Sequence, residues 1–134
     1  MNESPSRSML LAMLLLAAGA ASAGGSIESV GKARYLEDCA FCHGDGGKGN
    51  GPFAILLKRD PPDLTALAKA NGGHFPFEKV YESIDGRSRP LAHGGDEMPI
   101  WGQEWRAQGG VRSETELHGR VLEVMMYLRA IQAP

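Results

Sequence analysis

The stretch Cys39-Ala40-Phe41-Cys42-His43 places two thiols two residues apart, with an imidazole directly after the second. These are the only two cysteines among the 134 residues. A pair of this kind can form a redox-active disulfide, supply half of a metal site, or anchor a haem through two thioether bonds. The three interpretations predict three different proteins, so the rest of the sequence has to decide between them.

A thioredoxin-like disulfide requires the cysteine pair at the start of a helix that follows a β-strand. No run rich in Val and Ile precedes Cys39, and residues 27–38 have a helical pattern instead. A structural zinc site requires four ligands, so two would have to come from histidines that have no paired spacing, namely His43, His74, His93 and His118. The sequence therefore favours neither interpretation.

The same stretch meets the requirements of covalent haem attachment. Two thiols at this spacing can add to the two vinyl groups of one porphyrin, while the adjacent imidazole reaches the iron. We therefore expect one haem c per chain, bound covalently through Cys39 and Cys42, with His43 as an axial ligand of its iron.

The N-terminal segment has the features of a secretory signal peptide. Residues 9–18, MLLAMLLLAA, form an apolar run that is too short to cross a bilayer comfortably, and small residues follow it as far as Ala23. We expect cleavage after Ala23, which would leave residues 24–134 as one monohaem domain in the periplasm. The alternative is that residues 1–23 stay attached as an anchor helix.

Composition excludes some classes of function. The net charge is −2 and the isoelectric point is about 6.1, with basic residues scattered among acidic ones, so we expect no nucleic-acid partner. The sequence shows neither a pair of carboxylates nor a Ser-His-Asp arrangement, so we expect no catalysis by the chain itself. The chain contains 18 glycines and 8 prolines, which indicates many loops. A small domain of this kind usually needs an additional stabilising group such as a large cofactor.

Three features together resemble the class I c-type cytochromes. They are CAFCHGDGGKGNGP at residues 39–52, GGDEMPIWG at residues 94–102, and an amphipathic C-terminal helix. The resemblance covers nearly all of residues 24–134. It implies a small all-α fold in which short helices and loops surround one covalently bound haem.

Met98 is the expected second axial ligand of the iron. Met125 and Met126 lie within a helical pattern, where a methionine usually fills the core. Met98 precedes Pro99 in a glycine-flanked loop, which can bring the sulfur to the porphyrin, and the resembling family has its distal ligand in such a Met-Pro sequence. His93 is the competing ligand, and a second histidine would lower the reduction potential where methionine raises it.

Further residues are expected around the haem. An iron-bound imidazole usually donates its other N–H to a carbonyl, and the resemblance implies that Pro52 supplies this oxygen to His43. Arg87, Arg89 and Trp101 are candidate hydrogen-bond donors to the haem propionates.

Apolar periodicity predicts an all-helical domain. Ser113 and Glu116 form a capping box at the start of the last helix, which carries a long apolar stripe. The resemblance implies that the first and last helices cross, with Gly31 and Tyr35 facing Tyr127. The expected helices span residues 27–38, 63–70, 77–85 and 114–132.

An iron with His and Met ligands exchanges one electron without binding a substrate, so we expect a periplasmic electron-transfer protein. Its partners would be redox proteins, such as a dehydrogenase, a reductase or an oxidase, with no small-molecule substrate. One alternative is a haem-containing subunit of a membrane or periplasmic oxidoreductase complex. Another is a five-coordinate haem enzyme or gas sensor, which would require that Met98 does not bind the iron.

Overall fold

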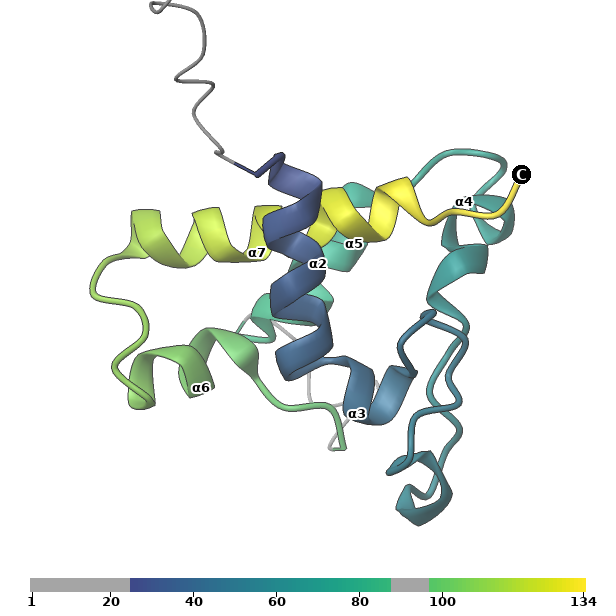
Figure 1. Cartoon of the computed structure of the whole chain (residues 1–134), viewed down its shortest axis with the longest axis horizontal. Helices are drawn as coiled ribbons and strands as arrows, with labels where there is room; N and C mark the ends of the chain where they lie inside the picture. Colours follow the sequence, from purple (N-terminus) through teal and green to yellow (C-terminus); the bar gives the residue numbers. More distant parts are fainter. Residues whose placement is uncertain (1–24, 88–96) are drawn as a thin grey trace, which may run out of the picture.

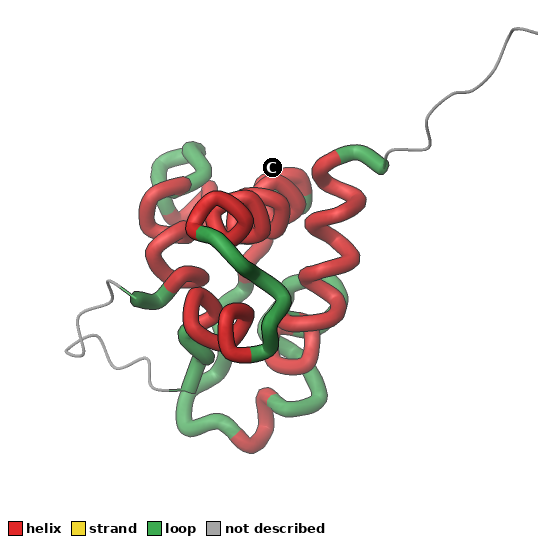
Figure 2. Tube along the Cα trace, turned by 90° about the vertical axis from the view of Figure 1, so that its left-hand side faces the viewer, coloured by secondary structure: helices red, strands yellow, loops and turns green. Residues whose placement is uncertain are grey.

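The computed structural model describes residues 25–87 and 97–134, and within these ranges every regular element is helical (Figures 1 and 2). The all-α prediction is therefore confirmed, and the arrangement is consistent with a small cytochrome-like fold. The expected signal peptide at residues 1–23 lies outside the described residues, as do Arg89 and His93. None of the described helices is both long enough and apolar enough to cross a membrane.

The elements follow one another along the chain as two long helices at its ends with shorter ones between them. They are α2 (Ile27–Asp38), α3 (Ala40–His43), η1 (Ala54–Leu56), η2 (Leu64–Ala66), α4 (Leu67–Ala70), α5 (Phe77–Asp85), α6 (Trp101–Ala107) and α7 (Glu114–Ala130).

Helices α2 and α7 cross at close range (Figure 1). A Cβ atom added to Gly31 would lie 1.9 Å from the carbonyl oxygen of Glu123, so only glycine allows this approach. The rings of Tyr35 and Tyr127 lie beside the crossing with 5.1 Å between their centroids. Arg34 forms an ion pair with Glu123 across the same contact. The crossing therefore has the arrangement that the resemblance implied.

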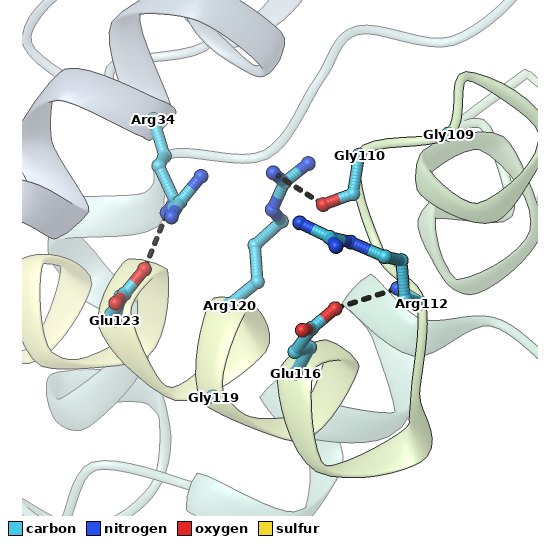
Figure 3. Close-up of a pocket in the computed structure, with 8 residues that line it drawn as sticks. All are labelled: Arg34, Gly109, Gly110, Arg112, Glu116, Gly119, Arg120 and Glu123. Carbon is cyan, nitrogen blue, oxygen red and sulfur yellow. Dashed lines mark hydrogen bonds and ion pairs between the residues drawn. The ribbon is translucent and has the colours of Figure 1, made fainter.

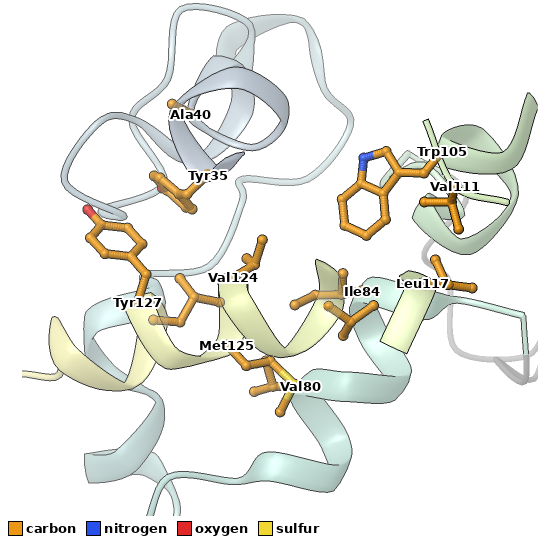
Figure 4. Packing of buried hydrophobic residues seen from close by; sticks show 12 residues of the cluster. Tyr35, Ala40, Val80, Ile84, Trp105, Val111, Leu117, Val124, Met125 and Tyr127 are labelled. Atoms are coloured by element: carbon orange, nitrogen blue, oxygen red, sulfur yellow. The ribbon is translucent and has the colours of Figure 1, made fainter. Parts of the chain in front are cut away.

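The hydrophobic core forms where α7 packs against α2, α5 and α6 (Figure 4). Helix α5 contributes Val80 and Ile84, and its Gly86 ends the helix in the left-handed conformation with φ 71°. The apolar stripe predicted along α7 is buried, as shown by Leu117, Val121, Val124, Met125 and Leu128. Periodicity alone was therefore sufficient to identify the face of α7 that meets the core.

The start of α7 is capped as predicted, with one difference. The hydroxyl of Ser113 accepts a hydrogen bond from the backbone N–H of Glu116 at 3.1 Å. The Glu116 carboxylate accepts from the N–H of Arg112 at 2.6 Å, one residue before the partner that a standard capping box would have. The first bond satisfies a backbone group that the first helical turn cannot pair internally, and the second satisfies the N–H of the residue before the cap.

The C-terminal residues lie against the segment that contains η2 and α4. Helix α7 ends at Ala130, two residues earlier than predicted, and the side chain of Gln132 binds the backbone of an earlier segment. Its side-chain amide donates to the carbonyl of Leu64 at 2.7 Å, and its side-chain oxygen accepts from the N–H of Ala68 at 2.8 Å. The predicted helix over residues 63–70 is present, but its first turn is a 3-10 helix.

Helix α6 was not predicted from the sequence. It has few apolar residues, and no side chain caps its start at Ile100. Its position is set by packing: Gly102 lies so close to Asp85 that an added Cβ would be 2.2 Å from a carboxylate oxygen. Trp105, only 1% exposed, inserts into the core. Tertiary contacts, which no local pattern encodes, therefore stabilise this helix.

Replacing Gly31 by alanine is expected to destabilise the fold by about 2–3 kcal/mol, because the new methyl group would overlap the Glu123 carbonyl and force the helices apart. Urea unfolding of the purified protein measures this loss. Lys32→Ala, at the exposed neighbouring position, is the control and should change the free energy of unfolding by less than about 0.5 kcal/mol. Equal stability of the two variants would show that the helices do not cross as described.

Candidate cofactor site

The two thiols and the imidazole lie on one helical turn at the end of α2. Helix α2 ends at Asp38, and Cys39 begins the short helix α3 in a right-handed helical conformation with φ −113° and ψ −35°. The backbone N–H of His43 donates to the carbonyl of Cys39 at 2.9 Å. Because residues three and four positions apart share a helix face, Cys39, Cys42 and His43 lie on the same side of this turn.

A glycine-rich loop closes over this turn. Gly49 donates to the carbonyl of His43 at 2.8 Å, and Gly51 donates to the carbonyl of Cys42 at 3.1 Å. A Cβ atom on Gly51 would lie 2.4 Å from the carbonyl oxygen of Phe41, so the loop can approach this closely only with glycine. The glycines after the cysteine motif therefore fix the backbone of the turn.

A hydrogen bond from Tyr35 also connects this turn to the crossing of α2 and α7. The buried hydroxyl of Tyr35 donates to the carbonyl of Gly44 at 2.6 Å, directly after His43. Burial raises the pKa of the Tyr35 hydroxyl, with the Cys39 thiol as a smaller cause, so the group stays a protonated donor. The position of the imidazole thus depends on the same tyrosine that packs against Tyr127.

The His43 side chain is buried and incompletely paired. Burial lowers the pKa of its imidazole, so the ring is held neutral, as a metal ligand must be. Its Nδ1 atom is buried and has no hydrogen-bond partner among the described residues. A buried polar atom without a partner is unusual and indicates a group that completes the site.

The expected carbonyl partner of His43 was that of Pro52, whose side chain is exposed in the structure. Burial has the larger effect on the pKa of the His43 imidazole, and the Pro62 backbone opposes it by a smaller amount. The carbonyl of Pro61 lies so near Gly49 that an added Cβ there would be 2.1 Å away, which shows how the glycine loop brings this second proline segment to the site. Nδ1 of His43 has no hydrogen bond to either proline carbonyl, so the role of Pro52 stays a prediction.

The two thiols are free and form no disulfide. Burial raises the pKa of Cys39 to about 12, and the neighbouring Asp38 and Cys42 contribute in the same direction. Burial also raises the pKa of Cys42. Among the described residues, no group of three or more His, Cys, Asp or Glu side chains is placed to hold a metal ion.

Met98 is half-buried and packs against the hydrophobic core. Cys39 and Trp101 pack against the same cluster, so the loop before α6 and the cysteine turn border one apolar region. Trp101 is half-buried, and its ring lies 5.6 Å from that of Trp105, centroid to centroid. The competing ligand His93 falls outside the described part of the chain.

Arg87, a candidate propionate donor, has other partners. Its Nε donates to the buried carboxylate of Asp85 at 2.8 Å, and its two terminal nitrogens both donate to Glu114 at 3.0 Å. Arg106 and Glu114 form a further ion pair. The arginine thereby links the end of α5 to the start of α7, and its role as a propionate donor stays a prediction.

Sequence reasoning missed one contact that joins the two sides of the candidate site. The indole N–H of Trp105, on the helix that follows Met98, donates to the carboxylate of Asp38 at 3.0 Å. Asp38 directly precedes Cys39. Burial raises the pKa of Asp38, and the bond from Trp105 opposes this effect. Two tryptophans four residues apart were a visible signal of a packed helix face, but nothing in the sequence identified Asp38 as the acceptor.

Comparisons of this chain with models of known protein families, with curated proteins and with solved structures gave no match.

Asp38→Ala is expected to cost about 1–3 kcal/mol, because it leaves the buried indole N–H of Trp105 without an acceptor. A double-mutant cycle with Trp105→Phe, measured by urea unfolding, should give a coupling energy of about 1 kcal/mol. Glu37→Ala, at the exposed adjacent position, is the control and should be nearly neutral. A coupling energy near zero would contradict the hydrogen bond.

Proposed function

We propose that the chain is an electron-transfer protein that carries one electron on a haem c attached through Cys39 and Cys42. The observation that carries this proposal is the helical turn that presents both thiols and the buried, neutral imidazole of His43 on one face. The unpartnered Nδ1 of that imidazole supports the presence of a further group at the site. Together these residues fit covalent attachment and axial ligation by a single cofactor.

When bound, the haem would supply a one-electron Fe(III)/Fe(II) couple. His43 would hold the iron on one side, with the position of its ring set by burial. Met98 is proposed as the second ligand, because it borders the same apolar cluster as Cys39. The apolar surroundings would exclude water from the site, and a thioether ligand would raise the reduction potential.

The raised thiol pKa values argue against a dithiol oxidoreductase. Such enzymes lower the pKa of the attacking cysteine so that a thiolate is present at neutral pH. In this chain burial raises the pKa of both Cys39 and Cys42, which keeps the free thiols protonated at neutral pH. Cysteines of this kind suit a permanent bond to a cofactor better than repeated exchange.

An apolar surface near the cysteine turn supports a protein partner. Phe41, between the cysteines, is 59% exposed and stacks on Phe53 at 5.2 Å between centroids. The adjacent element η1 lies against α3 and exposes Ile55 and Leu56. Exposed apolar side chains grouped in this way are typical of an interaction site. We propose that a redox protein of the periplasm docks here.

The attachment can be tested on protein produced in a host that attaches haem c. After denaturation and acid-acetone extraction, the haem spectrum should remain with the wild-type polypeptide, and no free thiol should be titratable. The double variant Cys39→Ser with Cys42→Ser should carry no bound haem. If the wild-type chain retains two free thiols and no haem after this treatment, the proposed function is wrong.

The second ligand can be tested separately. Met98→Ala should remove the weak red-end absorption band that methionine gives to ferric haem, lower the reduction potential, and allow carbon monoxide to bind. Met126→Ala, a half-buried methionine on α7, is the matched control and should leave the spectrum unchanged. If the wild-type protein lacks the band and binds carbon monoxide readily, the five-coordinate alternative is correct and the carrier proposal fails.

A further inference from the structure

A cleft of about 380 Å³ lies between α2, α7 and the connection from α6 to α7 (Figure 3). Arg34 comes from α2, Arg120 from α7, and Arg112 from the connection, so three separate elements place a guanidinium group at its walls. Cys39, Cys42, His43 and Met98 do not line this cleft, so it is distinct from the candidate cofactor site.

Two of these guanidinium groups have no carboxylate partner among the described residues. Arg120 donates to the carbonyl of Gly110 at 3.1 Å and lies over the ring of Trp105 at 5.3 Å. Arg112 uses only its backbone N–H, which donates to Glu116, and its exposed side chain extends into the cleft (Figure 3). Arg34, by contrast, is paired with Glu123. Two positive charges are therefore available to a ligand.

The floor of the cleft contains a glycine that packing does not require. Gly119 lies in the middle of α7, where glycine costs stability relative to alanine. A Cβ atom at this position would have no atom within 4 Å, unlike Gly31 on the opposite helix. The missing side chain therefore leaves the floor of the cleft open between Glu116 and Glu123, which lie one helical turn away on either side, at a cost in helix stability.

We propose that this cleft binds the phosphate group of a small anionic ligand. Guanidinium groups bind phosphate through pairs of charge-assisted hydrogen bonds. Arg112 and Arg120 reach the cleft from different elements, so a tetrahedral anion, with oxygens in several directions, can accept from both. A carboxylate offers only two oxygens, whereas a phosphate group offers at least three. The lining contains three arginines and two glutamates, and Glu123 is paired with Arg34, so the net charge of the lining is positive.

Isothermal titration calorimetry of the full-length protein, with pyrophosphate and inorganic phosphate as probes, tests this site. Acetate at equal ionic strength is the control for non-specific attraction of an anion to the positive charges. Arg112→Ala should weaken pyrophosphate binding about tenfold, since it removes one charged donor whose side chain makes no other contact. Arg112→Lys, which keeps the charge but loses the paired donors, should give an intermediate loss. Lys69→Ala, exposed on α4 and far from the lining residues in sequence, is the control.

Gly119→Leu provides a test that leaves every arginine in place. The new side chain should fill the floor of the cleft and abolish pyrophosphate binding, while the thermal midpoint is unchanged or raised because glycine is lost from a helix. Pyrophosphate binding that survives unchanged in Gly119→Leu, or binding no stronger than that of acetate in the wild type, would overturn the proposal. Neither result would bear on haem attachment, so the two proposals fail independently.

Discussion

The close approach of α2 to α7 at Gly31 is the constraint on which the rest of the structure depends. It brings Tyr35 against Tyr127, and the Tyr35 hydroxyl then holds the backbone directly after His43. The same crossing places the inner face of α7 over α5, which together form most of the core. A single missing side chain on α2 thus determines both the packing of the domain and the setting of its candidate site.

The candidate site is built from two parts of the chain that are far apart in sequence. One part is the cysteine turn, whose shape is fixed by the glycine loop and by the Tyr35 hydroxyl. The other is the loop with Met98, which leads into α6. Trp105 connects them, because its indole is buried in the core and donates to Asp38 beside Cys39. The hydrogen bond fixes the relative position of two elements that would otherwise share only apolar contacts.

Features that depend on residues close together in the sequence could be predicted. Helix α7 was predicted with its cap at Ser113 and its buried face, because capping and periodicity act within a few residues. Helix α6 was missed, since it is stabilised by Gly102 packing on Asp85, which is a contact between distant segments. The carbonyl partner of His43 stays a prediction, because it depends on the path of a loop. The assignment of haem itself still rests on the spacing of Cys39, Cys42 and His43.

The contacts of Gln132 have a consequence for the order in which the protein can form. Its partner Leu64 lies 68 positions earlier, and the ion pair between Arg34 and Glu123 spans 89 positions. A chain synthesised from its N-terminus therefore displays the cysteine turn long before α7 exists to support it. During that interval the two thiols belong to an open polypeptide, and the contacts of α7 with α2 and of Gln132 with Leu64 form only after the last residues have been synthesised.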